Sequence, residues 1–267
     1  MSTPKTVVVT GGTFGIGREL ALFLAERGHR VVAFGLEARQ AASTAEGSVT
    51  ALRAEVAERG LDVLVLEADV TDAAQVAGVT ERTLERFGGL DALVNNAAIG
   101  PLGTVLDTDE ELFDRILDVN LKGPYLCARA VLPHLIRAGG GSIVNIGSGA
   151  GWGKPNMAAY SASKGGLSAL STAMAYDFFH DHVRVNMVIP GGGGIASGIT
   201  HGRLGDDTEQ IRRAALGSAA GRPVTGADVA GVVDFLISDA GATISGTFID
   251  VGCFAQQGGP LERKKTA

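Results

Sequence analysis

The chain has 267 residues and a net charge of −6, with 45% hydrophobic and 19% charged residues. This composition is typical of a globular protein, and it excludes a disordered chain and a nucleic-acid-binding surface built on excess positive charge. The two cysteines show no C-x-x-C spacing and no histidine cluster accompanies them, so we expect neither a disulfide framework nor a metal site.

Short apolar runs rich in β-branched residues alternate along the chain with longer stretches of helical periodicity. Strands are predicted at 6–10, 31–34, 63–67, 90–95, 142–146, 183–189 and 247–251. Helices are predicted at 15–27, within 39–59, and at 73–87, 110–138, 158–180 and 228–238. Several strands are continuously apolar, which is typical of a parallel sheet covered on both faces. The alternation therefore predicts an α/β fold with a Rossmann-like, doubly wound parallel sheet of about seven strands and helices on both faces.

Nothing in the composition divides the chain, because it contains no long Pro- or Ser-rich linker and no internal repeat. We expect one domain over residues 1–267, with a glycine-rich substrate lid around 191–222 and a flexible tail around 257–267. The chain has no apolar run of about 18 residues and no room for a signal sequence before its first strand, so we expect no membrane contact and a cytoplasmic location.

The first predicted strand leads into a glycine-rich turn that opens the first helix. Gly11, Gly15 and Gly17 bring the backbone close to a ligand at a helix N-terminus, whose free N–H groups favour a pyrophosphate. A tight strand–helix turn without a ligand is the alternative. The turn lacks the GK[ST] ending of a phosphate-hydrolysing P-loop.

A second motif lies at the start of the helix predicted at 158–180. Tyr160 and Lys164 are four residues apart, so both side chains project from one face of that helix. An ammonium one turn away stabilises a phenolate and lowers the tyrosine pKa towards neutrality. Ser148 follows the fifth strand and offers a hydroxyl to the same substrate oxygen. An exposed Tyr and Lys on an ordinary helix is the alternative reading.

These motifs occur in the order and spacing of one family. The set comprises T-G-x-x-x-G-I-G at 10–17, N-N-A-A at 95–98, then Asn120, Ser148 and Tyr160-x-x-x-Lys164. With them the chain resembles the short-chain dehydrogenases/reductases over nearly its whole length. The resemblance implies hydride transfer between NAD(H) or NADP(H) and a ketone or secondary alcohol, in a homotetramer or homodimer.

The resemblance also implies roles for individual residues. Tyr160 is the expected general acid in reduction and base in oxidation, Lys164 lowers its pKa, Ser148 orients the substrate oxygen and Asn120 holds a relay water. The residues expected at the cofactor are Gly11, Thr13, Phe14, Gly15, Ile16, Gly17, Gly35, Leu36, Asp69, Val70, Asn96, Ala97, Tyr160, Lys164, Pro190 and Gly191. Ser148, Trp152 and Tyr160 are expected at the substrate. Two of these residues also have purely structural interpretations: Asn120 as a polar residue satisfied inside a helix, and Asp69 as a helix N-cap or a turn residue.

The choice between the two nicotinamide cofactors depends on the end of the second strand. An acidic side chain there binds ribose hydroxyls, and a basic one binds a 2′-phosphate. Gly35, Leu36 and Phe14 occupy the positions where the family often places these charges, which favours NAD(H). Three interpretations of the next charged residues remain open. Glu37 reaches the ribose, Arg39 reaches a phosphate, or solvent surrounds both side chains.

Two points keep a different class of function open. The segment 191–197 lacks the threonine that often follows Pro-Gly in the family, which leaves a non-catalytic dinucleotide-binding sensor or scaffold as the alternative. A methyltransferase-like nucleotide binder shares the glycine-rich turn but gives no reason for Tyr160, Lys164 and Ser148 to occur together.

The helix predicted at 158–180 carries apolar residues that suit either the core or a subunit contact, namely Leu167, Leu170 and Met174.

Overall fold

A computed structural model describes residues 3–37, 48–190, 199, 218, 220, 222 and 224–252. The predicted site residues Gly191 and Arg39 lie outside these residues, as do most of the predicted lid at 191–222 and the whole predicted tail at 257–267.

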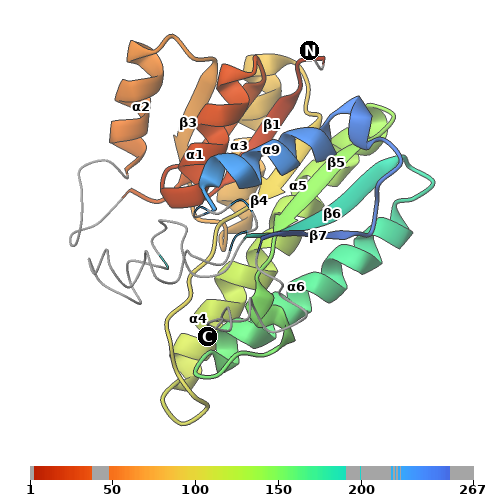
Figure 1. Ribbon diagram of the computed structural model, residues 1–267. Coiled ribbons are helices and arrows are strands. Elements are labelled where there is room, and N and C mark those ends of the chain that lie inside the picture. Colours follow the sequence, from red (N-terminus) through yellow and green to blue (C-terminus); the bar gives the residue numbers. More distant parts are fainter. Residues whose placement is uncertain are drawn as a thin grey trace, which may run out of the picture.

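Seven parallel strands form a single sheet in the order β3-β2-β1-β4-β5-β6-β7 (Figure 1). The strands are β1 Thr6–Thr10, β2 Arg30–Gly35, β3 Val63–Glu67, β4 Ala92–Asn95, β5 Gly141–Ile146, β6 Val183–Pro190 and β7 Phe248–Val251. The strand order reverses between β1 and β4. In a doubly wound sheet a ligand binds outside the carboxyl ends of the strands at such a reversal.

The helices that join the strands lie close to their predicted positions. They are α1 Gly15–Glu26, α2 Val49–Glu58, α3 Ala73–Phe87, α4 Glu110–Leu117, α5 Gly123–Arg137, α6 Ala158–Asp177 and α9 Gly226–Ile237. None of the described helices is long and apolar enough to cross a membrane.

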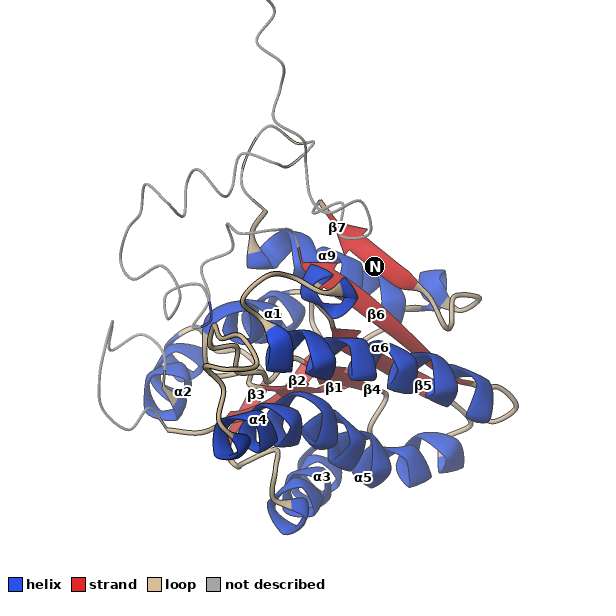
Figure 2. Cartoon of the chain, turned by 90° about the horizontal axis from the view of Figure 1, so that it is seen from below, coloured by secondary structure: helices blue, strands red, loops and turns tan. Residues whose placement is uncertain are grey.

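Helices lie on both faces of the sheet (Figure 2). On each face an apolar core fills the space between the sheet and its helices. On β1, Val7 and Val9 point into the core shared with α1, α2 and α9, whereas Val8 points into the core shared with α3, α5 and α6. The alternation of side chains along a strand explains this division. It also explains why the strands read as continuous apolar runs, since both of their faces are buried.

The helix predicted over 110–138 is interrupted, which corrects the sequence-based expectation. A π turn at Asp118–Lys122 separates α4 from α5, and the backbone N–H of Gly123 donates to the carbonyl of Asp118. Pro124 supplies the physical reason, because proline has no N–H to donate to the carbonyl of Asn120 four residues earlier. The interruption falls at a predicted catalytic residue, as π turns often do.

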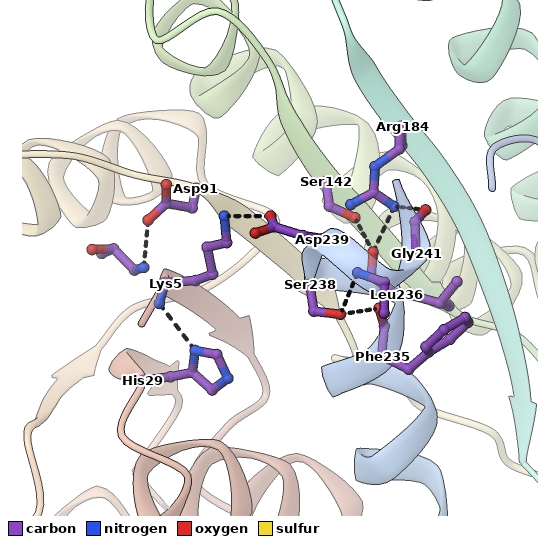
Figure 3. A network of polar contacts seen from close by, with 12 residues as sticks. Lys5, His29, Asp91, Ser142, Arg184, Phe235, Leu236, Ser238, Asp239 and Gly241 are labelled. Carbon is purple, nitrogen blue, oxygen red and sulfur yellow. Dashed lines mark hydrogen bonds and ion pairs between the residues drawn. The ribbon is translucent and has the colours of Figure 1, made fainter. Parts of the chain in front are cut away.

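The opposite edge of the sheet, at the amino ends of the strands, is held by a polar network (Figure 3). Arg184 of β6 donates from Nη1 to the carbonyl of Leu236 (2.6 Å), near the end of α9, and to that of Gly241 (2.9 Å) just beyond it. The backbone N–H of Lys5 donates to Nδ1 of the buried His29 at 3.0 Å, and its ammonium lies 3.3 Å from Asp239. These polar groups fix the end of α9 to the sheet, at the edge opposite the carboxyl ends of the strands.

Candidate active site

The glycine-rich turn is packed too tightly for larger residues. A Cβ atom at Gly17 would overlap the carbonyl of Gly11 and Nδ2 of Asn96. Helix α1 begins after Phe14, the N-cap residue, which has an extended backbone. The side chain of Phe14 makes no hydrogen bond to the first N–H groups of the helix. These N–H groups and the positive end of the helix dipole suit a pyrophosphate, so the turn fits a dinucleotide.

A second contact joins this turn to the carboxyl end of β4. Thr10 Oγ1 accepts hydrogen bonds from the backbone N–H groups of Asn96 (3.0 Å) and Ala97 (2.9 Å). Asn96 Nδ2 donates in return to the carbonyls of Thr10 (3.0 Å) and Gly11 (3.2 Å). The point where the strand order reverses is therefore cross-linked by four hydrogen bonds. The sequence motif contains Thr10, but its role was not anticipated.

Tyr160 and Lys164 lie together at the start of α6, and both are buried. The ammonium of Lys164 lies 5.9 Å from the centre of the Tyr160 ring and donates to the carbonyl of Ile146 at 2.9 Å. Burial lowers the pKa of Lys164 from 10.5 to about 8. A lysine with such a pKa changes charge near the working range, which is the property that proton-transfer chemistry requires.

Ser148 follows β5 and begins a 3-10 turn at Gly149–Trp152. Its Oγ accepts a hydrogen bond from the backbone N–H of Ala150 at 3.2 Å. Because Ile146, two residues earlier, accepts from Lys164, the end of β5 and the start of α6 are held next to each other. Trp152, at the end of the turn, keeps 46% of its surface exposed.

Asn120 lies in the π turn, is fully buried, and holds the loop that follows β4. Its Oδ1 accepts from the backbone N–H of Ile99 and its Nδ2 donates to the Ile99 carbonyl, both at 2.8 Å. Nδ2 also donates to Oγ of Ser163 at 3.0 Å. The amide group thus has partners for its oxygen and for two donor directions, which is the structural reading of Asn120 that the sequence left open.

At the end of β2, the side chain of Thr13 fills the space that a side chain at Gly35 would need. A Cβ at Gly35 would lie 2.6 Å from Thr13 Oγ1, so this strand end cannot carry a side chain while Thr13 keeps its position. Phe14 and Leu36 stay 38% and 52% exposed beside it. The carboxylate of Glu37 accepts hydrogen bonds from Thr50 at the start of α2, from the backbone N–H at 3.2 Å and from the hydroxyl at 3.3 Å.

Asp69 and Val70 follow β3, as the sequence suggested. Asp69 Oδ1 accepts from the backbone N–H of Thr71 (2.9 Å) and from its hydroxyl (2.8 Å), and Oδ2 lies 3.8 Å from Arg115. Asp69 is therefore a turn residue, whereas Asp72 caps α3. Val70 is buried, and Pro190 ends β6 at the same edge of the sheet. No metal-binding cluster of His, Cys, Asp or Glu exists among the described residues.

Comparison with known proteins decides the family. The model of the short chain dehydrogenase family matches residues 5–202. The chain belongs to this family. It is accordingly an NAD(P)-dependent oxidoreductase that acts on a ketone or secondary alcohol, and the non-catalytic alternative is not favoured.

Individual relatives match over most of their length. A protein named 2-(S)-hydroxypropyl-CoM dehydrogenase 3, from Xanthobacter autotrophicus, is 37% identical over 96% of both chains. The 3-oxoacyl-[acyl-carrier-protein] reductase FabG of Staphylococcus aureus is 32% identical over 94% of this chain and 98% of its own. A Brucella melitensis 3-ketoacyl-(acyl-carrier-protein) reductase, solved in complex with NADH, superposes with a TM-score of 0.78 at 28% identity, over 92% and 96% of the two chains.

Proposed function

We propose that Tyr160, Lys164, Ser148 and Asn120 form the catalytic group of this short-chain dehydrogenase. Tyr160 Oη donates a proton to the substrate oxygen in reduction and takes it back in oxidation. The bound nicotinamide cofactor supplies or accepts the hydride. Ser148 donates a hydrogen bond that orients the substrate oxygen, and Asn120 fixes the π turn beside the loop after β4. The observation that carries this proposal is the buried lysine one helical turn from a buried tyrosine.

The lowered pKa of Lys164 fits this role. Burial removes water from around the ammonium and so disfavours its charged form. A negative charge beside the ammonium compensates for this lost hydration. A phenolate at Tyr160 is such a charge. The pair therefore stabilises the tyrosinate that alcohol oxidation needs as a base.

We propose that the carboxyl edge of the sheet binds the dinucleotide. The glycine-rich turn holds the pyrophosphate, the ends of β2 and β3 hold the adenosine, and the ends of β4 and β6 border the nicotinamide with Tyr160 and Lys164. The residues assigned to this surface are Gly11, Thr13, Phe14, Gly15, Ile16, Gly17, Gly35, Leu36, Asp69, Val70, Asn96, Ala97, Tyr160, Lys164, Pro190 and Gly191. The tight packing around Gly17 and the uncapped α1 N-terminus support this placement.

We propose NAD(H) as the preferred cofactor, because Phe14 and Leu36 offer a 2′-phosphate no positive charge. Leu36→Arg should raise the affinity for NADPH about tenfold, since a charge-assisted hydrogen bond contributes roughly 1.5 kcal/mol, and should leave NADH affinity within about twofold. Fluorescence titration with both cofactors measures this. Leu106→Arg adds the same charge at a leucine that is 95% exposed, and serves as the control. Tighter binding of NADPH than of NADH by the wild-type protein contradicts the proposal.

The substrate we propose is a small or medium ketone or secondary alcohol, with Ser148, Trp152 and Tyr160 in contact with it. The names of two relatives contain a 2-hydroxypropyl group and a 3-oxoacyl group, which are a secondary alcohol and a ketone. A panel of both compound classes, assayed by NADH absorbance, tests the proposal. Absence of turnover with the whole panel, in a protein that binds NADH, would count against this substrate class.

We propose that the enzyme is a homotetramer assembled through α6. The exposed face of α6 carries Ala162, Ala169, Ala173 and Tyr176, and the one exposed charge on this helix is Asp177 at its last position, because Lys164 is buried. Leu167 and Met174 belong to the core instead. Light scattering should give four times the chain mass of 27.3 kDa. Ala169→Arg should lower that mass and Ala77→Arg, at an exposed alanine on α3, should not. A wild-type monomer contradicts the proposal.

We also propose a cytoplasmic location. Within the part of the chain that the structure describes, Cys127 is a free, buried thiol whose pKa burial raises to about 12, and such a cysteine suits a reducing compartment.

A further inference from the structure

Ser163 lies between Tyr160 and Lys164 on α6 and is fully buried. It is a serine inside a helix, where a hydroxyl competes with the backbone and is mildly unfavourable unless it finds a partner. The family motif requires Tyr160 and Lys164, and the chemistry proposed above leaves Ser163 without a role. Its hydrogen bonds suggest one.

The Ser163 hydroxyl joins two catalytic elements. Oγ donates to the carbonyl of Tyr160 at 2.7 Å and accepts from Nδ2 of Asn120 at 3.0 Å. Asn120 in turn holds the N–H and the carbonyl of Ile99, both at 2.8 Å. One hydroxyl therefore connects the backbone at Tyr160 to the π turn and, through it, to the loop that follows β4.

Apolar packing already holds the π turn against α6, since Leu121 packs on the buried cluster that contains Leu167, and the hydrogen bonds add a directional link. The loop after β4 begins with Asn96 and Ala97, which are tied to the glycine-rich turn by Thr10. The π turn is a break in a helix, and α6 is a separate element. A chain of hydrogen bonds runs from the backbone of Ile99 through the buried side chains of Asn120 and Ser163 to the carbonyl of Tyr160.

We propose that Ser163 is a positioning residue that sets the place of the Tyr160 phenol relative to Lys164 and to the cofactor side of the site. The inference rests on the roles proposed above for Tyr160 and Lys164. Loss of the hydroxyl leaves a buried Asn120 donor without its partner and removes one hydrogen bond to the carbonyl of Tyr160. Small displacements of reacting groups carry large kinetic costs, since about 1 Å of misplacement can lower a rate a hundredfold.

The same helix contains a serine in a nearly identical environment. Ser171 is buried, donates from Oγ to the carbonyl of Leu167 at 2.7 Å and accepts from Nδ2 of Asn145 at 2.7 Å. Both serines thus join α6 to a buried asparagine amide and lose the same two hydrogen bonds on replacement by alanine. Only Ser163 is connected to the catalytic group, so Ser171→Ala reports the purely structural cost.

The experiment compares Ser163→Ala, Ser163→Thr and Ser171→Ala with the wild-type enzyme, at a temperature below the melting midpoint of all four. Ser163→Ala should lower kcat for alcohol oxidation by about 10- to 100-fold, with the NADH dissociation constant within about twofold of wild type. Because Lys164 then stabilises the phenolate less well, the rising limb of the pH–rate profile should move to higher pH. Ser163→Thr keeps the hydroxyl and should restore most of kcat. Ser171→Ala should melt at a similarly lowered temperature but keep the wild-type kcat and profile.

An equal effect of Ser163→Ala and Ser171→Ala on kcat, with an unchanged pH–rate profile in both, overturns the inference. Tyr160→Phe is measured alongside and separates this failure from a failure of the proposed function. If Tyr160→Phe is inactive while the two serine variants behave alike, only the role of Ser163 is wrong. If Tyr160→Phe turns over normally, the catalytic assignment itself is wrong.

Discussion

Tyr160→Phe is expected to lower turnover by about a thousandfold while NADH binds as it does to the wild-type enzyme. The variant removes one oxygen atom, and with it the proton that the substrate oxygen receives. A positioned acid or base typically contributes between about a hundredfold and ten-thousandfold to a rate. Steady-state kinetics with a substrate from the ketone panel, together with NADH fluorescence, separate the loss of turnover from a loss of binding.

Tyr176 provides a matched control on the same helix. It is 80% exposed, and Tyr176→Phe removes the same atom away from the buried catalytic group. Turnover of this variant should stay within about twofold of wild type. Near-normal turnover of Tyr160→Phe would show that another group transfers the proton.

Lys164→Met is expected to abolish most turnover and to make the folded protein more stable. Burial lowers the pKa of Lys164 from 10.5 to about 8, which means that the charged form costs the folded state roughly 3 kcal/mol at pH values below 8. Methionine fills a similar volume without the charge. The carbonyl of Ile146 loses its donor, which costs about 1 kcal/mol, so a net gain of about 1–2 kcal/mol in the free energy of unfolding remains.

The pH dependence of stability identifies the source of this gain. Between pH 8 and 10.5 the unfolded chain binds a proton at Lys164 that the folded chain has released, so the wild-type free energy of unfolding should rise with pH in this window. Lys164→Met should lack this contribution, whereas Lys122→Met should keep it, because Lys122 is an exposed lysine paired with Asp118. Denaturant titrations at several pH values measure the effect. A destabilised Lys164→Met protein would contradict the account.

The sequence predicted the sheet well because its signal is physical and local. Runs such as residues 6–10 and 63–67 are apolar on both faces, and the structure confirms strands with these bounds. The α3 helix was predicted to the residue, since Asp72 caps it and Gly88 ends it in a left-handed conformation. The family assignment from the ordered motifs is confirmed as well.

What the sequence missed depends on contacts between distant segments. The periodicity of 110–138 predicts one helix, and the contact of the Asn120 amide with the backbone of Ile99, which holds the π turn in place, joins segments 21 residues apart. Pro124 was the one local signal that could have revealed it. The roles of Thr10 and Ser163 likewise come from partners 86 and 43 residues away in the chain. The exclusion of a side chain at Gly35 by Thr13 is a packing relation that no spacing rule contains.

In the proposed mechanism, Lys164 brings Tyr160 into its working range as an acid and base. The pH dependence of kcat/KM for secondary-alcohol oxidation, measured for the wild-type enzyme and for Lys164→Met, tests this role. The account predicts a wild-type rate that rises with pH along a limb whose apparent pKa lies well below about 10, the ordinary value for tyrosine, and the loss of that limb in the variant. A wild-type rate that is flat from pH 6 to pH 10, or a limb that Lys164→Met leaves in place, would contradict it.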